Sequence, residues 1–465
     1  MNPEITRIFD LQLANKRKIR QTSAEERIQK INRLMEAIND RLPELKKAVF
    51  EDLGKPPAEA MLSEIYPITT EIKTMRRKLA KWLHPKHVRA PIALLGSKNE
   101  IHLEPKGVVL IMAPWNFPFQ LAISPLMSAI AAGNCVMLKP SEISANTSKF
   151  IKSLIDDVFE QNEVAVFEGD AEVGKALLEL PFNHILFTGS TSVGKKVMAA
   201  AAKHLSSVTL ELGGKSPVII DKTADIKEAA KRITWGKFLN AGQTCIAPDY
   251  VLVPKKQLDE FVDKSKKHIQ KLYGKKAVNN NMDYCRIIDE KAFTRLKNLV
   301  DEALKSGAAI QIGGEFTDDN FIAPTLMTNV SLDSGIMKEE IFGPILPILP
   351  YDSIEDALDM INSKPNPLAL YIFSKDKEIN RQILQNTSAG DTVINDVVVH
   401  FSNINLPFGG SNHSGIGKSH GFAGFKAFSH ERSVMRQPRF SMVKLLYPPY
   451  SAITKKIIDL TVKYF

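Results

Sequence analysis

The sequence contains few cysteines and no long apolar segment. Its 465 residues include only three cysteines, Cys135, Cys245 and Cys285, an odd number that cannot form a disulfide framework and that favours a reducing compartment. No run approaches the roughly 20 consecutive apolar residues of a membrane-spanning helix. The amino terminus also lacks the apolar core of a secretory signal. We therefore expect a cytoplasmic protein without a transmembrane segment.

Internal repeats and low-complexity linkers are also absent, which predicts lobes that pack against each other and are not joined by a flexible linker. The formal net charge of +9 could indicate a nucleic-acid partner or an anionic membrane surface. However, acidic residues are interspersed with the basic ones along amphipathic segments such as Lys18–Lys47 and Asp259–Lys276. A solvated surface is the better interpretation, so we expect no nucleic-acid partner.

Apolar runs alternate with helical patterns along most of the chain, and the 44% hydrophobic content can supply substantial cores. Short continuous apolar runs predict strands at Val108–Met112, Cys135–Leu138, Val164–Phe167, Ile185–Thr188 and Val208–Leu212. Helix-like stretches such as Leu121–Ala132 and Val193–His204 separate these runs. The series predicts a parallel sheet covered on both faces, for which a nucleotide is the expected ligand.

A second alternating region follows and contains Cys245. Its predicted strands are Val218–Ile220, Tyr250–Val253, Ile310–Ile312, Leu346–Leu349 and Leu370–Phe373. The residues alone therefore predict an α/β fold with two lobes.

A nucleophile is indicated by Cys245, which ends the polar turn Asn240-Ala-Gly-Gln-Thr-Cys245. Cysteine attacks as a thiolate, so it needs an electropositive or dipole-rich setting and a partner that handles protons. Glu211, in Glu211-Leu-Gly-Gly, is a candidate for that partner. Asn116, in Pro114-Trp-Asn-Phe-Pro118, could donate to an oxyanion. The alternative is a buried structural cysteine beside an ordinary loop glutamate.

Two strand ends carry residues suited to a nucleotide. Gly189 and Ser190 form a turn that opens a helix containing Gly194, and a helix amino terminus favours a phosphate. Lys139 and Glu142 could hydrogen-bond ribose hydroxyls, since one donates and the other accepts. The alternatives are a generic strand–helix turn and a solvated helix start, because the dinucleotide fingerprint itself is absent.

Seven motifs in order resemble those of the aldehyde dehydrogenase family. They are Pro114–Pro118, Lys139–Glu142, Phe187–Ser190, Glu211–Gly214, Gly242–Cys245, Glu340–Pro344 and Leu406–Gly410. Further features are similar to the class 3 and fatty-aldehyde branch, namely Cys245–Tyr250, Asn395–Val397 with His400, and Tyr447–Pro449.

The resemblance implies NAD(P)-dependent oxidation of aldehydes to carboxylic acids. A carboxylate at Glu142 near the adenosine ribose should repel the 2′-phosphate of NADP, so we expect NAD to be preferred. It implies that Cys245 attacks the aldehyde, that Asn116 stabilises the oxyanion and that Glu211 activates the water that hydrolyses the thioester. It assigns the cofactor to Lys139, Glu142, Gly189, Ser190, Gly194, Glu340 and Phe342, and the aldehyde tunnel to Phe408. Glu340 is preferred to Glu339 because it directly precedes Ile341-Phe342. No metal site is expected.

The resemblance also implies the division of the chain. A Rossmann-type NAD(P)-binding domain takes residues 1–85 and 107–211, and the α/β catalytic domain takes 212–396. A small β arm made of 86–106 and 397–435 bridges subunits in a homodimer, and 436–465 form a carboxy-terminal tail.

The substrate and two other functions stay open at this stage. The class 3 resemblance suggests medium- to long-chain aliphatic or aromatic aldehydes. A CoA-acylating enzyme is disfavoured by Glu211, and a catalytically silent structural or binding protein is disfavoured by the intact Cys245, Glu211 and Asn116.

The tail has apolar residues at helical spacing, Ile453, Ile457, Leu460 and Tyr464. It could be a core-docked helix, a lid over the aldehyde tunnel, or a weak peripheral membrane contact.

Three further side chains are given no role. Cys135 lies in an apolar strand run and should be inert core. Cys285 is expected in a polar loop without an evident partner, and His413 is expected to be a solvated loop residue.

Overall fold

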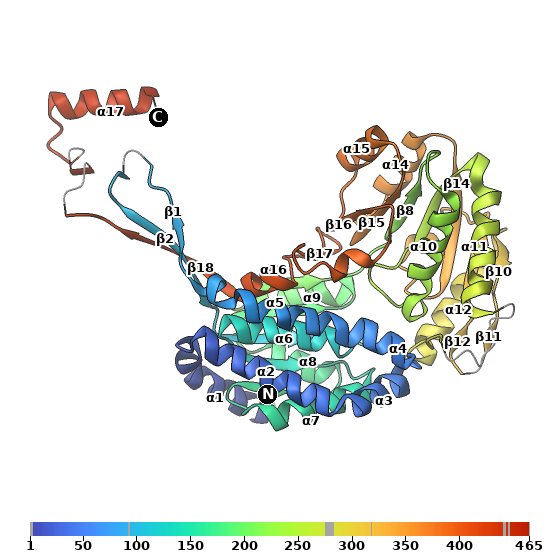
Figure 1. Cartoon of the computed structure of the whole chain (residues 1–465), viewed down its shortest axis with the longest axis horizontal. Coiled ribbons are helices and arrows are strands. Elements are labelled where there is room, and N and C mark those ends of the chain that lie inside the picture. Colours follow the sequence, from blue (N-terminus) through green and yellow to red (C-terminus); the bar gives the residue numbers. More distant parts are fainter. Residues whose placement is uncertain are drawn as a thin grey trace.

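The structure is a computed structural model that describes residues 3–91, 94–274, 283–317, 319–439, 443–444 and 447–464. Two large sheets with their helices form the body, and a small sheet projects from it as an arm (Figure 1). The α/β architecture predicted from the apolar runs is confirmed.

The first large sheet has six strands in the order β17-β7-β6-β3-β4-β5. Its five parallel strands are β3 (Val108–Met112), β4 (Cys135–Lys139), β5 (Val164–Val166), β6 (His184–Thr188) and β7 (Ser207–Glu211). They overlap the five strands predicted from the sequence. The short β17 (Gly415–Ile416) adds an antiparallel edge to β7 and comes from a segment far along the chain.

Alternate residues of these strands face two separate cores, as a sheet covered on both faces requires. Val109 and Ile111 pack with one helical layer, whereas Val108 and Leu110 pack with another. The first layer contains α2 (Ala24–Asp40), α3 (Leu42–Leu53), α5 (Tyr66–Leu83), α6 (Gln120–Ala132) and α7 (Ala145–Val158). The second contains α1 (Pro3–Arg20), α8 (Ala171–Leu178) and α9 (Thr191–Ala202).

The second large sheet has seven strands in the order β10-β13-β14-β9-β8-β15-β16. They are β8 (Pro217–Ile220), β9 (Tyr250–Pro254), β10 (Ala309–Ile312), β13 (Thr325–Thr328), β14 (Ile345–Tyr351), β15 (Ala369–Phe373) and β16 (Asp391–Ile394). All neighbours are parallel except β10 and β13. The sequence did not predict β13 and β16, because neither is a continuous apolar run.

Helices cover the second sheet, and the loop that carries Cys245 follows one of them. They are α10 (Ile226–Phe238), α11 (Leu258–Tyr273), α12 (Glu290–Lys305), α14 (Ile354–Asn362) and α15 (Lys377–Asn386). Cys245 lies in the connection between α10 and β9.

The arm is an antiparallel sheet of β1 (Lys86–Val88), β2 (Lys98–Pro105) and β18 (Ser429–Arg436). The strand that the carboxy-terminal part of the chain adds to this sheet begins at Ser429. The preceding helix α16 (Gly421–Ala427) stays on the body, because Phe425 and Phe428 are buried in the core with α5 and α6.

The carboxy-terminal helix α17 (Ala452–Tyr464) lies beyond the arm, away from the two large sheets (Figure 1). Ile453 is 73% exposed and Val462 is 81% exposed, while Thr454 is buried. A helix docked on the core of its own chain would bury its apolar residues, so of the three alternatives for the tail the core-docked helix does not fit this structure. Among the described residues, no helix is long and apolar enough to cross a bilayer.

Candidate functional site

The carboxyl ends of the parallel strands in the first sheet bring four predicted motifs to one edge. Asn116 follows β3, Lys139 ends β4, Ser190 follows β6 and Glu211 ends β7. This edge of a parallel α/β sheet is where such folds bind ligands, because loops and helix amino termini converge there. The loop that carries Cys245 reaches the same edge from the second sheet.

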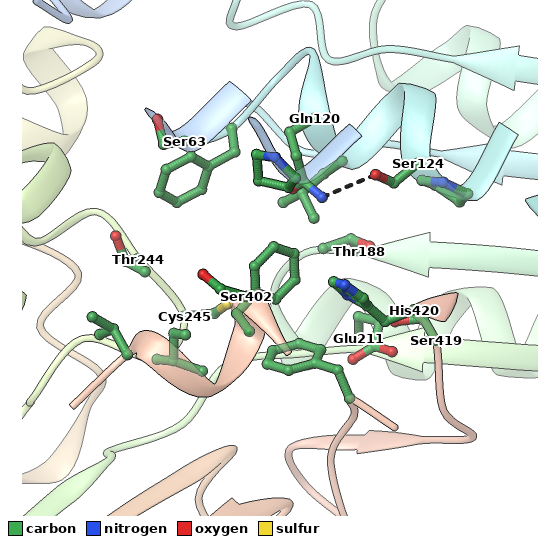
Figure 2. Close-up of a pocket in the computed structure, with 18 of the residues that line it drawn as sticks. Ser63, Gln120, Ser124, Thr188, Glu211, Thr244, Cys245, Ser402, Ser419 and His420 are labelled. Carbon is green, nitrogen blue, oxygen red and sulfur yellow. Dashed lines mark hydrogen bonds between the residues drawn. The ribbon is translucent and has the colours of Figure 1, made fainter. Parts of the chain in front are cut away.

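Cys245 and Glu211 line one cavity, which has a volume of about 200 Å³. Figure 2 shows both side chains directed into it. Most of the wall is apolar and is contributed by both halves of the body. It includes Leu62, Phe117, Leu121, Phe401, Phe408 and Phe428. Phe408 thus lies where the resemblance places it, and its ring stacks against His400 at 5.8 Å.

The backbone before Cys245 has an uncommon shape. Asn240 and Ala241 have φ angles of 52° and 51°, in the left-handed region that residues with a β-carbon seldom adopt. Gly242 follows with a φ of 73°, and a β-carbon there would collide with the carbonyl oxygen of Gly343. A turn of this kind persists only where the surrounding structure holds it.

Hydrogen bonds from two other segments hold the turn. The Asn116 amide nitrogen donates to the Gln243 carbonyl at 3.0 Å, so Asn116 lies directly against the thiol loop. Gln243 donates to the Arg286 carbonyl at 2.9 Å and accepts from the Ile288 N–H at 3.0 Å. The amide nitrogen of Asn116 carries a second N–H besides the one in this bond.

A buried charged cluster that the sequence analysis missed supports the same loop. Lys55 and Glu64 form an ion pair at 2.5 Å, and the Lys55 ammonium also donates to the Asn116 carbonyl at 3.2 Å. Glu59 accepts the Asn240 N–H at 2.8 Å. Because these residues lie far from the thiol in the chain, no local pattern identifies them.

The expectation for Cys285 is wrong. The residue is 1% exposed and its Sγ donates to the Glu59 carboxylate at 3.5 Å, so it is a buried member of the supporting cluster. Burial raises the pKa of Cys285 well above that of a free thiol. Cys135 is fully buried in β4, and burial raises its pKa to about 12, which agrees with an inert core thiol. His413 is exposed on its loop, as expected.

The environment of Cys245 is not electropositive. Burial, Glu340 and Glu211 raise the pKa of its thiol to about 12, whereas the backbone N–H groups of Cys245 and Ile246 lower it. The thiol is therefore protonated in this state of the protein. Nucleophilic attack requires that its proton leave as the new bond forms.

Glu211 is 7% exposed, and neither carboxylate oxygen has a hydrogen-bond partner among the described residues within bonding distance. Burial raises the pKa of Glu211 to about 8, and the nearby Ser419 hydroxyl and the Lys418 ammonium lower it only in part. A carboxyl group with a pKa in this range can take up a proton near neutral pH, which general-base catalysis requires.

Glu340 and Phe342 reach the gap between the two sheets. Burial raises the pKa of Glu340 to about 8, and a β-carbon at Gly213 would collide with its carboxylate. The Phe342 ring lies edge-on to Trp115 with centroids 5.3 Å apart. In contrast, Glu339 is half exposed and pairs with Arg295 at 2.9 Å.

The remaining predicted cofactor residues lie along the same edge. The buried Lys139 ammonium pairs with the Glu142 carboxylate at 2.8 Å, and Glu142 is partly exposed. The exposed Ser190 caps α9, whose Val193 N–H donates to its hydroxyl. Gly194 faces Leu212, and the close packing between them leaves no room for a β-carbon.

Known proteins resemble this chain over almost its whole length. Residues 3–434 match the aldehyde dehydrogenase family. The chain is 43% identical to 4,4'-diaponeurosporen-aldehyde dehydrogenase of Staphylococcus aureus, with 93% of each chain covered. It is 41% identical to the dimeric NADP-preferring aldehyde dehydrogenase of Rattus norvegicus, with 92% of this chain and 94% of the other covered.

Two further similarities identify the branch and the fold. The chain is 42% identical to aldehyde dehydrogenase family 3 member A2 of Macaca fascicularis, covering 91% of this chain and 87% of the other. The solved structure of substrate-bound Staphylococcus aureus AldH superimposes with a TM-score of 0.95 at 41% identity, covering 99% and 100% of the two chains. The chain belongs to the aldehyde dehydrogenase family and resembles its class 3 members, and it is an NAD(P)-dependent oxidoreductase that acts on aldehydes.

Proposed function

We propose that Cys245 is the nucleophile and Glu211 the general base of this aldehyde dehydrogenase. The observation that carries the proposal is their position on the wall of one cavity, where each pKa is raised and the Glu211 carboxylate contributes to the rise at Cys245. The product is a carboxylic acid, and the reaction passes through a thioester on Cys245.

The first step forms a bond between Cys245 Sγ and the carbonyl carbon, while the thiol proton passes to solvent water directly or through Glu211, which leaves Glu211 unprotonated for the later hydrolysis. Negative charge develops on the former carbonyl oxygen. The free N–H of the Asn116 amide and the backbone N–H of Cys245 can donate to that oxygen. Such preorganised donors act strongly where water is excluded. Gln243 holds Asn116 in place for this role.

The residues at the sheet edge fit a dinucleotide. The amino terminus of α9 with Ser190 suits a phosphate, and close packing at Gly194 brings that terminus near the sheet. Lys139 and Glu142 would hold the adenosine ribose, Glu340 the nicotinamide ribose, and Phe342 would pack near the ring. Held there, NAD(P)⁺ would supply the hydride acceptor that the oxidation needs.

Hydrolysis releases the acid. Glu211 takes a proton from water as the water oxygen attacks the thioester carbon, and the carbon–sulfur bond then breaks to return the Cys245 sulfur. The raised pKa of Glu211 suits this proton transfer. A CoA-acylating enzyme would pass the acyl group to a thiol instead and would not need this base.

The apolar and aromatic wall of the cavity supports medium- to long-chain aliphatic or aromatic aldehydes as substrates. The experiment is a steady-state substrate panel that follows formation of the reduced cofactor, with and without CoA. We expect the highest kcat/KM for such aldehydes and no requirement for CoA. Turnover that depends on CoA would overturn the hydrolytic proposal.

Cofactor choice gives a separate prediction. A carboxylate at Glu142 near the adenosine ribose repels the 2′-phosphate of NADP⁺, while its ion pair with Lys139 weakens that repulsion. We expect both cofactors to be used and NAD⁺ to have the higher kcat/KM. Replacing Glu142 with Gln should shift the ratio towards NADP⁺, whereas Glu172→Gln, on the exposed start of α8, should not. Equal or better kcat/KM for NADP⁺ in the wild type would mean that Glu142 does not face that phosphate.

A homodimer is proposed for the assembled enzyme. The arm and α17 project from the body with exposed apolar side chains, among them Val88, Met435 and Ile453. Contact with a second copy of the chain would bury these side chains, and the relative from Rattus norvegicus is named as dimeric. Sedimentation velocity at micromolar concentration measures the assembly directly, and a monomer would refute the proposal.

The tail gives a further prediction that distinguishes a lid from a membrane contact. Because α17 lies far from the cavity of its own chain, it could act as a lid only on another copy. If it does, deleting Ile453–Phe465 should change kcat/KM for long-chain aldehydes more than for acetaldehyde. Binding to anionic liposomes that is lost on deletion would favour the membrane contact instead.

A cytoplasmic location is proposed on chemical grounds. The three cysteines are free, and a nucleophilic thiol at Cys245 must stay reduced to act.

A further inference from the structure

A polar group interrupts the apolar wall of the catalytic cavity. Glu71 on α5 and His420, which precedes α16, both line the cavity, together with Gln120 and Ser124 of α6. Figure 2 shows His420, Gln120 and Ser124 at the side of the cavity that lies away from Thr244. The Gln120 amide donates to the Ser124 hydroxyl at 3.2 Å, whereas the side chains of Glu71 and His420 form no hydrogen bond with each other.

Glu71 has spare hydrogen-bonding capacity. The residue is 1% exposed, and one carboxylate oxygen accepts the Gly421 N–H at 3.2 Å. This contact anchors the start of α16 and accounts for one oxygen. The other oxygen, Oε2, has no hydrogen-bond partner among the described residues. An unpaired buried carboxylate oxygen is costly, so a donor supplied from the cavity would stabilise it.

His420 is placed beside Glu71 by packing rather than by a hydrogen bond. Its Nε2 is 3.8 Å from Glu71 Oε1, which is beyond hydrogen-bond range. Its ring stands edge-on to Phe401 with centroids 4.7 Å apart, and its φ of 78° is in the left-handed region. A strained backbone that directs a polar ring into a ligand cavity is a feature of functional positions.

We propose that Glu71 and His420 bind a hydroxyl group on the substrate, remote from its carbonyl. The hydroxyl donates to Glu71 Oε2 and accepts from a ring N–H of His420, so both of its hydrogen-bonding roles are used. The neighbouring rings of Phe401 and Phe428 suit a planar substrate. The preferred substrates are therefore aromatic aldehydes that carry a ring hydroxyl. This inference rests on the proposed function and specifies its substrate.

A site built to bind a hydroxyl discriminates strongly, because the analogue without the hydroxyl leaves buried polar groups unpaired. The test is the ratio of kcat/KM for para-hydroxycinnamaldehyde to that for cinnamaldehyde. We expect the wild-type ratio to be roughly tenfold or more in favour of the hydroxylated aldehyde. Glu71→Gln replaces an acceptor oxygen by an amide N–H. His420→Phe keeps an aromatic ring at this position but removes the two ring nitrogens. Both ratios should fall towards one.

The ratio separates recognition from a structural role. A variant that only disturbs the fold lowers kcat/KM for both aldehydes together and leaves their ratio unchanged. That result would overturn the proposal. A wild-type ratio near one would overturn it as well. His430→Phe makes the same replacement at an exposed position on β18 and should keep the wild-type ratio. If neither aldehyde is oxidised, the proposed function itself fails, so the two failures are distinguishable.

Discussion

Replacing Cys245 with alanine should abolish aldehyde oxidation while the protein still folds and binds its cofactor. The thiol supplies the bond that holds the substrate through hydride loss, and no other cysteine lines the cavity in the described part of the chain. Alanine removes one sulfur atom at a half-buried position and leaves the supporting hydrogen bonds to Asn240 and Gln243 unchanged. Steady-state turnover, cofactor titration and thermal unfolding measure the three properties separately.

The other two cysteines supply matched controls. Cys135→Ala changes a core residue of β4, and Cys285→Ala removes a donor to Glu59, yet both retain the nucleophile. Both should keep substantial activity per folded molecule. Turnover by folded Cys245→Ala within about tenfold of the wild type would exclude Cys245 as the nucleophile, since loss of a covalent nucleophile costs far more than this.

Replacing Glu211 with glutamine should allow the thiol to acylate but stall hydrolysis of the thioester. Glutamine keeps the volume of the side chain and cannot accept the proton of the attacking water. A burst of about one reduced cofactor per active site should therefore precede slow turnover in rapid-mixing experiments. An unchanged steady-state rate would show that another group is the base. Glu339→Gln, at an exposed carboxylate, should leave both phases as in the wild type.

The pH dependence follows from the same carboxylate. Burial raises the pKa of Glu211 to about 8, so the basic form is the minor one below that pH and becomes the major one above it. Single-turnover hydrolysis of the acylated enzyme should therefore accelerate as the pH rises through this region. Glu211→Gln should lose that rise. A wild-type hydrolysis rate that does not vary with pH between 6 and 9, about the range spanning this pKa, would argue against Glu211 as the base.

Local patterns in the sequence determined most of the fold and predicted the two groups that we propose to react. Parallel strands buried on both faces appear as continuous apolar runs, and β3, β4, β6 and β7 were predicted from such runs. The thiol turn and Glu211 were identified because a polar, glycine-containing turn is a local feature. Strands β13, β16 and β17 were missed because each is short and not continuously apolar, so its pairing depends on neighbours distant in the chain.

Only the tertiary structure determined the pKa values and the contacts of the groups that we propose to react. A nucleophilic thiol needs an electropositive or dipole-rich setting, and the sequence did not show what surrounds Cys245. In the structure, burial beside Glu340 and Glu211 raises its pKa to about 12. Glu59 and Cys285 are 226 positions apart in the chain and meet beneath the thiol loop, and Glu71 meets Gly421 across 350 positions. Desolvation and hydrogen bonding depend on which surfaces come together in the folded chain. Periodicity reports which face of a segment is buried, but it contains no information about which distant polar group is buried against it.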